Sequence, residues 1–264
     1  MLRGYTNLKG IARNSELSTR NLLATSVEGM TAESINKLPT LDSVKRTIRR
    51  CKRREEEFYG NPSSCAEIII PDRFKFTLND ESFLLFDSGE GDDHRMILFG
   101  TSKFLSKLKE SINWHCDGTY KVAPEHFFQL YTIHAQRDGY IFPCVYALFQ
   151  AKTEETYERM LSKLLQLESE LNPTPIMVDF DKAAINALEN TFLACVYGCF
   201  FHLKQSIYRR IQANGLATAH QQDRDLALKL KMLPCLAFVP ESDVIDCFNI
   251  LMHEYPQSGK TVAK

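Results

Sequence analysis

Two aspartates stand where an acidic side chain is poorly placed for packing but well placed to hold a cation. Asp117 lies in the segment Trp114–Tyr120 and Asp179 in the segment Pro175–Lys182, each at the end of an apolar, strand-like run and just before a break. Carboxylate oxygens are the ligands that Mg²⁺ and Mn²⁺ prefer. Two such ions stabilise the attacking and leaving oxygens of an in-line phosphoryl displacement. The alternative interpretation is a pair of solvated turn aspartates, and the surrounding elements must decide between the two.

Length and composition indicate an ordinary globular protein. The 264 residues are 44% hydrophobic and 25% charged, which fits one domain of about 150 residues with appendages. No apolar run approaches the roughly 18 residues of a membrane span, so we expect no membrane partner. The eight cysteines show no Cys-x-x-Cys spacing, which argues against a disulfide framework or a four-cysteine zinc site and fits a reducing compartment.

Positive charge is concentrated near the N-terminus. Residues 1–54 contain 12 Lys and Arg against 4 Asp and Glu, and the run 45–54 holds seven cations, among them Arg49, Arg50 and Arg53. Such a run is typical of a nuclear-import signal or of a phosphate-contacting patch, and it favours a nuclear location. A solvated helix face is an equally good interpretation, so the run alone identifies no nucleic-acid partner.

The order of elements from residue 112 onward indicates an α/β core with a mixed sheet. In chain order we expect strands over 112–122, 127–135 and 140–150, a helix that opens with a capping sequence at 153–156, a strand over 176–178, a helix from 182, a strand over 194–201 and a helix over 202–210. This order resembles that of a ribonuclease H-like domain. The resemblance implies that the first and fourth strands are neighbours, which would bring Asp117 and Asp179 together, and that helices cover both faces of the sheet.

The chain is expected to have four segments. Residues 1–40 are polar and weakly periodic, which indicates disorder or loosely docked helices. Residues 41–110 are expected to form a small α+β region with a basic helix, residues 111–213 the ribonuclease H-like core, and residues 214–264 a partial helical insertion. Within the second segment, short apolar runs predict strands over 67–70, 74–77, 83–86 and 95–99, followed by a helix over 101–110.

The stretch from about 112 to 240 resembles the MULE domain, the transposase domain of Mutator-like elements. The matching segments are Trp114–Tyr120, Phe128–His134, Tyr146–Leu148, Lys152–Tyr157, Val178–Ile185, Gly198–Leu203 and Met232–Pro240. Several ordered motifs in register are far more specific than any one of them.

The resemblance implies a transposase of the DDE superfamily, whose core uses two Asp and one Glu to hold Mg²⁺ or Mn²⁺. Asp117 matches the first acid and Asp179 the second. The implied chemistry is hydrolysis of a DNA strand at the element end, followed by attack of the freed 3′-hydroxyl on target DNA in DNA transposition. The implied partners are transposon ends and target DNA, with a homo-oligomer as a candidate assembly.

Other residues of the family motifs are weaker candidates. Cys199 and His202 match the Cys-x-x-His motif of the family, and we favour a structural or site-lining role over zinc because no second pair of ligands is evident. Strand alternation predicts that Cys199 and Phe201 share one strand face. Asp181 lies close to Asp179 and is a weak candidate ligand.

Basic side chains offer candidate DNA contacts. The helix over 202–210 carries Lys204, Arg209 and Arg210, and the basic run carries Arg49, Arg50 and Arg53. Contacts from such residues to phosphates position a protein on DNA without reading its sequence. A solvated helix face is again the alternative.

The third acid of the family is not matched. The resemblance places it in an Asn-Asn-x-x-Glu-x-x-His segment beyond a helical insertion, and we expect the chain to stop inside that insertion, where Glu241 and Glu254 lie. We therefore expect the ancestral strand cleavage and transfer to be impaired. A non-catalytic DNA- or protein-binding remnant of a Mutator-like transposon is the alternative. A metal-dependent exonuclease would need an Asp-x-Glu pair on its first strand, which Cys116–Thr119 does not supply.

Overall fold

The computed structural model describes residues 11, 18–27, 40–56, 62–255 and 262. The chain divides into two compact units, Met1–Pro71 and Asp72–Lys264. Each unit is described by itself.

The described part of the first unit is mainly helical. Its helices are α2 (Thr19–Val27), α4 (Leu41–Glu56) and the short 3₁₀ helix η2 (Cys65–Glu67). Helix α4 confirms the basic helix that the sequence predicts. Arg49 and Arg50 are exposed on it, whereas the side chain of Arg53 lies outside the described residues, as does most of the segment 1–40.

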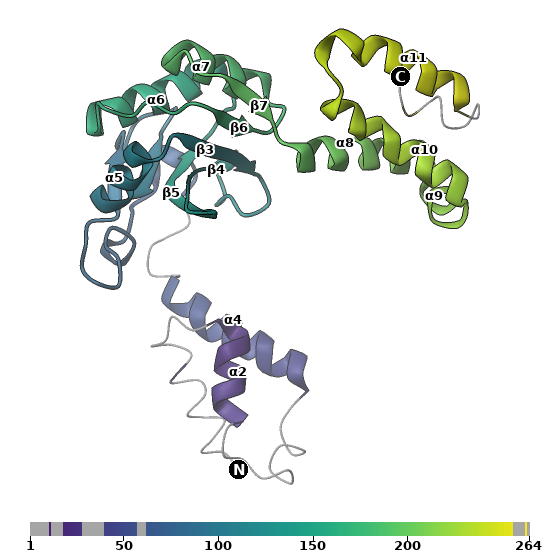
Figure 1. Cartoon of the computed structure of the whole chain (residues 1–264). Coiled ribbons are helices and arrows are strands. Elements are labelled where there is room, and N and C mark those ends of the chain that lie inside the picture. The colour runs from purple at the N-terminus through teal and green to yellow at the C-terminus, as the bar shows by residue number, and fades with distance from the viewer. Residues whose placement is uncertain (1–10, 12–17, 28–39, 57–61, 256–261, 263–264) are drawn as a thin grey trace. The chain divides into compact units, whose positions relative to one another are not determined.

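A seven-stranded mixed sheet organises the second unit (Figure 1). Its strands are β1 (Leu84–Asp87), β2 (Ile97–Gly100), β3 (Asn113–Thr119), β4 (Gln129–Arg137), β5 (Tyr140–Phe149), β6 (Ile176–Val178) and β7 (Val196–Gly198). They lie in the order β1-β2-β5-β4-β3-β6-β7. The pairings from β1 to β3 are antiparallel, whereas β3, β6 and β7 are parallel. This confirms the α/β class, and the topology is consistent with a ribonuclease H-like fold.

The register of the parallel strands is what positions the two aspartates. Trp114 of β3 pairs with Ile176 of β6, an offset of 62 positions. The same offset separates Asp117 from Asp179, so the two acids lie level with each other at the ends of neighbouring strands. Strand β7 continues this alignment, because Val178 pairs with Gly198.

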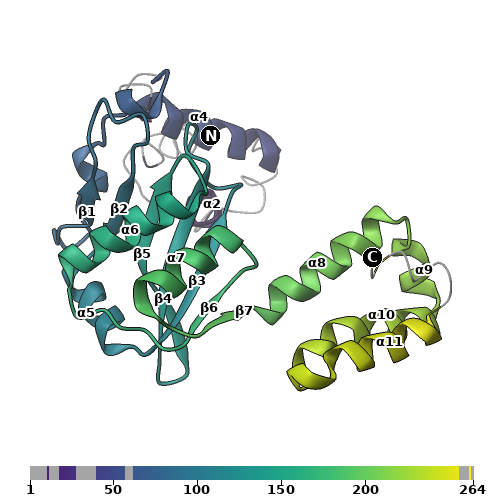
Figure 2. The same cartoon turned by 90° about the horizontal axis from the view of Figure 1, so that it is seen from above.

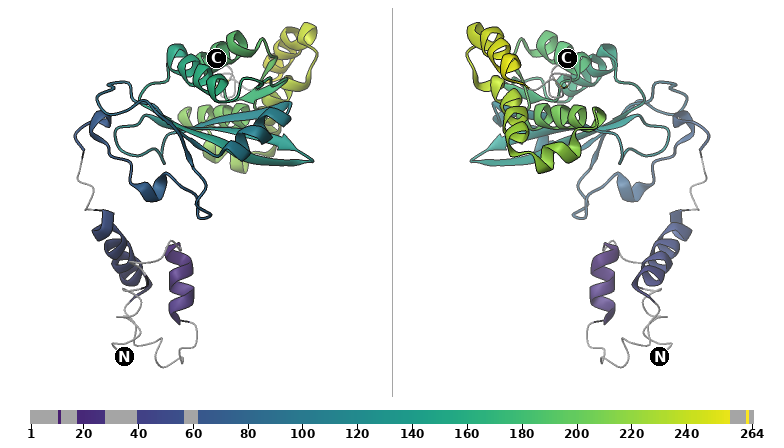
Figure 3. Two further views of the ribbon diagram at one scale, coloured as in Figure 1. Left: turned by 90° about the vertical axis from the view of Figure 1, so that its left-hand side faces the viewer. Right: turned by 90° about the vertical axis from the view of Figure 1, so that its right-hand side faces the viewer.

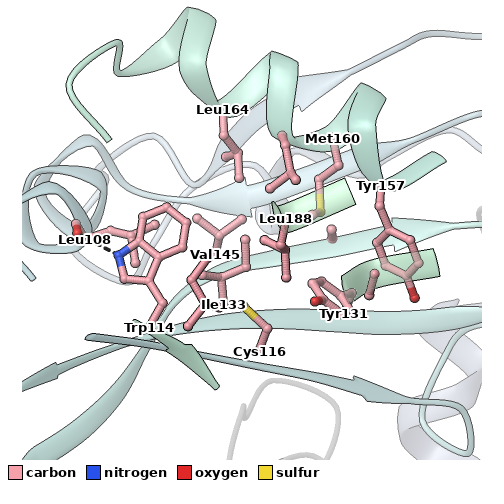
Figure 4. Close-up of a cluster of buried hydrophobic side chains, with 14 of the residues drawn as sticks. Leu108, Trp114, Cys116, Tyr131, Ile133, Val145, Tyr157, Met160, Leu164 and Leu188 are labelled. Atoms are coloured by element: carbon pink, nitrogen blue, oxygen red, sulfur yellow. Dashed lines mark hydrogen bonds between the residues drawn. The ribbon is translucent and has the colours of Figure 1, made fainter. Parts of the chain in front are cut away.

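One face of the sheet is covered by helices α5 (Ser102–Glu110), α6 (Glu154–Leu167) and α7 (Lys182–Phe192). The views of Figures 1 and 3 agree that α6 and α7 lie on the same side. Figure 4 shows the core between these layers, where Trp114, Tyr157 and Leu164 are buried. The Trp114 indole Nε1 donates a hydrogen bond to the Leu108 carbonyl oxygen at 3.1 Å, which ties α5 to β3.

The other face of the sheet carries polar side chains. His115 and Asp117 of β3 lie opposite His134 and Thr132 of β4 on this face, and all four are partly exposed. Antiparallel strands that alternate apolar and polar residues can leave one face to water, so this pattern does not require a second helical layer.

Three predicted strands need correction. The runs 67–70 and 74–77 form no strand; they lie at η2 and at a second 3₁₀ helix, η3 (Asp72–Phe74), with one isolated bridge between Phe76 and Ser82. The run 194–201 forms a strand only over Val196–Gly198. The predicted strands over 83–86 and 95–99 correspond to β1 and β2, which join the same sheet as the core. The four-segment division of the chain stays a prediction.

Helix α8 (Phe200–Ala213) leaves the sheet after β7 and begins a helical segment (Figure 2). It is followed by α9 (Ala217–Gln222), α10 (Arg224–Cys235), η4 (Leu236–Phe238), η5 (Glu241–Asp243) and α11 (Val244–Glu254). These helices bury a small core of their own, with Ile211, Leu230 and Leu251 in it. Among the described helices, none has the length and apolarity to cross a membrane.

Candidate functional site

One edge of the sheet collects most of the residues that could do chemistry. Strands β3 and β5 both run antiparallel to β4, and β6 and β7 run parallel to β3, so the carboxyl ends of these four strands meet at one edge. We call it the carboxyl edge; it comprises residues 117–120, Lys152, residues 179–181 and residues 199–202. Ligands of open α/β sheets bind outside such strand ends.

The Asp117 side chain lies at the carboxyl edge, on the polar face of β3. Its Oδ2 accepts a hydrogen bond from Thr119 Oγ1 at 3.3 Å. Its Oδ1 lies 3.0 Å from His202 Nε2, but this oxygen is shielded from solvent and accepts no hydrogen bond of good geometry from the described residues. A shielded acceptor without a donor is costly. The Asp117 carboxylate therefore has an oxygen that lies against His202 and accepts no hydrogen bond from the described residues.

Asp179 follows β6 directly and is also poorly compensated. Its Oδ1 accepts a hydrogen bond from the backbone N–H of Asp181 at 3.1 Å. Burial raises the pKa of the Asp179 carboxyl, and the negative charges of Asp181 and Asp117 raise it further, against the opposing effects of that hydrogen bond and of His202. Among the described residues, no lysine or arginine forms an ion pair with Asp117 or Asp179.

Asp181 differs because the protein satisfies both of its oxygens. Oδ1 caps helix α7 by accepting from the Ala183 N–H at 3.2 Å. Oδ2 accepts from the Tyr157 hydroxyl at 2.8 Å and lies 3.2 Å from Lys152 Nζ. The side chain is only 7% exposed. These contacts give Asp181, the weak ligand candidate, an anchoring role for α7.

The hydrogen bonds around Asp181 extend into the core through Tyr157. Gln129 Nε2 donates to the Tyr157 hydroxyl oxygen at 2.8 Å, and Gln129 is fully buried. A Cβ added to Gly118 would lie 2.6 Å from Gln129 Oε1. The glycine after Asp117 thus permits a close approach between β3 and the buried network. Sequence reasoning missed Gln129, although a polar residue at an inward position of β4 is a readable signal.

The Cys-x-x-His motif divides between the end of β7 and the first turn of α8. Cys199 is the N-cap residue of α8, and its backbone N–H donates to the Val178 oxygen at 2.7 Å. Phe201 lies within α8, so the prediction that Cys199 and Phe201 share a strand face is wrong. His202 reaches Asp117, and Cys199 adds no ligand: the described residues contain no group of three or more His, Cys, Asp or Glu arranged to hold a metal ion.

The basic residues of α8 are all exposed but point in different directions. At 100° per residue, Arg209 lies within about 20° of His202 around the helix and roughly 10 Å further along it. Lys204 lies on another side, with its Nζ 5.7 Å from the Phe200 ring centroid. Arg209 therefore shares the side of α8 that faces the two aspartates, and Lys204 does not. Arg49 and Arg50 belong to the first unit.

The fold and the site together define an α/β protein with a ribonuclease H-like sheet and two level aspartates at its carboxyl edge. Residues 113–206 match the family model of the MULE transposase domain. Over these residues the chain carries a MULE transposase domain, as its motifs indicate. The match runs from β3 into α8 and includes both aspartates and the Cys-x-x-His motif. Comparison with curated proteins finds no match.

Proposed function

We propose that the carboxyl edge is a partial site for a divalent cation, in which Asp117 and Asp179 supply two carboxylates to Mg²⁺ or Mn²⁺. One observation carries the proposal: the β3–β6 register places the two acids level at the ends of adjacent strands. The domain is transposase-derived, and a transposase domain implies DNA as the partner.

The chemistry of the two acids fits such a cation. Mg²⁺ is commonly held by one or two carboxylates together with waters and phosphate oxygens. In the part of the chain that the structure describes, Asp117 Oδ1 accepts no hydrogen bond, and burial disfavours the charged form of Asp179. When bound, the cation would stabilise the charge that develops on a phosphodiester during in-line displacement.

The residues around the acids have supporting roles. His202 packs against Asp117 Oδ1 and restricts the orientation of that carboxylate. Asp181 fixes the start of α7 and, through its backbone N–H, the Asp179 side chain. Arg209 is placed to contact a DNA phosphate beyond His202.

We further propose that strand cleavage and strand transfer are impaired in this 264-residue chain. Besides Asp117, Asp181 is an acid whose negative charge raises the pKa of Asp179, but its oxygens are engaged by Ala183, Tyr157 and Lys152. Fewer carboxylates weaken both the affinity and the geometry of a metal site. A non-catalytic DNA- or protein-binding role is the second candidate. It is favoured because both Asp181 oxygens are already engaged by the protein.

Metal binding by the full chain tests the partial site without requiring activity. Titration with Mn²⁺, followed by electron paramagnetic resonance, should show binding that Asp117→Asn and Asp179→Asn each weaken by roughly tenfold or more. Asp138→Asn is the matched control, because Asp138 is 86% exposed in the hairpin at the opposite edge of the sheet. Equal Mn²⁺ affinity in the parent and in the Asp117→Asn/Asp179→Asn double variant would refute the proposal.

A DNA-joining assay tests the proposed impairment. The purified chain should not join DNA strands in Mg²⁺ or Mn²⁺. Strand joining that is lost on Asp117→Asn would show instead that the two aspartates suffice for activity.

A further inference from the structure

Two aromatic rings are exposed beside the aspartates. Tyr120 follows β3, Phe128 precedes β4, and they are 44% and 49% exposed. Their ring centroids lie 5.5 Å apart at an interplanar angle of 79°. Large aromatic side chains gain most from burial, so a pair half open to solvent at a candidate site suggests a ligand with a flat, apolar surface.

A lysine completes this group. Lys152 Nζ lies 3.3 Å from the Tyr120 hydroxyl and 5.7 Å from the Tyr120 ring centroid. The same nitrogen lies 3.2 Å from Asp181 Oδ2, and the Lys152 side chain is 39% exposed. The amine is therefore held beside the Tyr120 ring, while part of the Lys152 side chain remains open to solvent.

The group adjoins the two acids through the backbone. Tyr120 is three residues after Asp117, at most about 10 Å along an extended strand. Asp181, the ion-pair partner of Lys152, donates its backbone N–H to Asp179 Oδ1 at 3.1 Å. A strand of nucleic acid with one phosphate at the acids would place a neighbouring nucleotide at the rings.

We propose that Tyr120, Phe128 and Lys152 form a nucleotide subsite that receives an unpaired base and an adjacent phosphate of single-stranded DNA. Aromatic side chains stack on any base because every base has a π face, and a cation beside them tracks the backbone. A base inside a duplex is already stacked on both sides, so the subsite favours a strand that is unpaired at this point. The inference rests on the proposed DNA-directed function of the same edge.

Binding to a fluorescein-labelled oligothymidylate, measured by anisotropy with the full chain in EDTA, tests the subsite apart from any metal. Tyr120→Ala and Phe128→Ala should each weaken binding about tenfold, within the range found for base stacking. Lys152→Gln should weaken binding and reduce its salt dependence by about one ion. Tyr120→Trp keeps a stacking ring and should retain the affinity.

Matched controls come from the same unit. Tyr140→Ala removes a 75% exposed ring from the hairpin at the opposite edge. Lys163→Gln removes an amine on α6. This amine lies 4.4 Å from the centroid of the Phe86 ring. Both controls should bind the oligonucleotide within twofold of the parent, and thermal melting should show that every variant is folded.

The subsite is overturned if the parent does not bind the oligonucleotide, if Tyr120→Ala and Phe128→Ala bind it as tightly as the parent, or if Tyr140→Ala loses as much affinity. A loss of stability without a loss of affinity would assign the rings to packing of the β3–β4 loop alone. The Mn²⁺ titration is independent of this test. Failure of the metal proposal with intact aromatic effects, or the reverse, would therefore separate the two proposals.

Discussion

Two regions of the carboxyl edge differ in how far the protein satisfies the oxygens of their aspartates. At the start of α7, Asp181 is nearly buried, and each of its oxygens has a partner. At the ends of β3 and β6, Asp117 keeps a shielded oxygen that accepts no hydrogen bond from any described residue, and Asp179 has its pKa raised mainly by burial. The acids lie close together, but only one of them is integrated into the fold.

The difference separates structural from functional carboxylates. An acid that stabilises the folded state has its charge and its lone pairs satisfied by the protein, whereas an acid that binds a ligand leaves part of this capacity unused. By this criterion Asp181 stabilises the folded state, whereas Asp117 and Asp179 are the acids available to bind a ligand.

Replacing Asp181 should have the largest effect on stability. Asp181→Asn keeps an N-cap acceptor but removes the charge that pairs with Lys152. We expect a loss of about 2–3 kcal/mol in the free energy of unfolding, less than the roughly 3–5 kcal/mol for a fully buried pair, because the Lys152 side chain is 39% exposed. Urea unfolding at pH 7 measures it.

Asp117→Asn is the comparison variant for that experiment. Its side chain is 42% exposed, and we expect the free energy of unfolding to change by no more than about 0.5 kcal/mol. If Asp117→Asn destabilised the protein as much as Asp181→Asn does, Asp117 would also be an acid that stabilises the folded state, and the distinction between the two regions would be wrong.

Gly118 connects the two regions, and its replacement should have an intermediate effect. The Cβ of Gly118→Ala would meet the buried Gln129 Oε1 at 2.6 Å, and overpacking of this kind costs about 1–2 kcal/mol. The strain should also displace the neighbouring Asp117 and weaken Mn²⁺ binding. Urea unfolding and Mn²⁺ titration measure the two effects.

Gly198→Ala, at the same edge, is the control for Gly118→Ala. Its Cβ would approach the Phe180 ring at 2.6 Å, but Phe180 is 54% exposed and can move aside. We expect a smaller loss of stability than for Gly118→Ala. A larger loss would mean that the buried Gln129 is not what makes Gly118 necessary.

The convergence of Asp117 and Asp179 could be predicted because the order of elements resembles that of a ribonuclease H-like domain, and this resemblance implies which strands are neighbours. Their level placement comes from the β3–β6 register. The start of α6 was predictable too: Thr153 caps it by accepting a hydrogen bond from the Thr156 N–H. Both predictions rest on patterns that are local or shared by a fold.

The role of Asp181 could not be predicted in the same way. Its N-cap position can be read from the sequence, but its partners Tyr157 and Lys152 lie 24 and 29 positions away, and only the packing of α6 against α7 brings them together. The end of β7 was misjudged for a different reason. The run 194–201 is apolar throughout, and periodicity alone cannot separate a buried strand from the first turn of the helix at Phe200.

The smallest expected effect is a gain in stability at Asp179. A carboxyl whose pKa is raised by folding binds its proton more tightly in the native state. Stability therefore falls as the pH rises from the ordinary carboxyl value of about 4 through the raised folded value. Asp179→Asn cannot ionise, so the variant should match the parent at low pH and exceed it at pH 7, by an amount on the order of 0.5 kcal/mol.

Urea unfolding of Asp179→Asn and parent between pH 3.5 and pH 7 would follow this difference across the window. Asp138→Asn corrects for the loss of one negative charge at an exposed position. Saturating Mn²⁺ should reverse the order at pH 7, because a ligand that binds only the folded parent stabilises it by mass action. If Asp179→Asn were less stable than the parent at pH 7 without metal, Asp179 would belong with Asp181 among the acids that hold the fold.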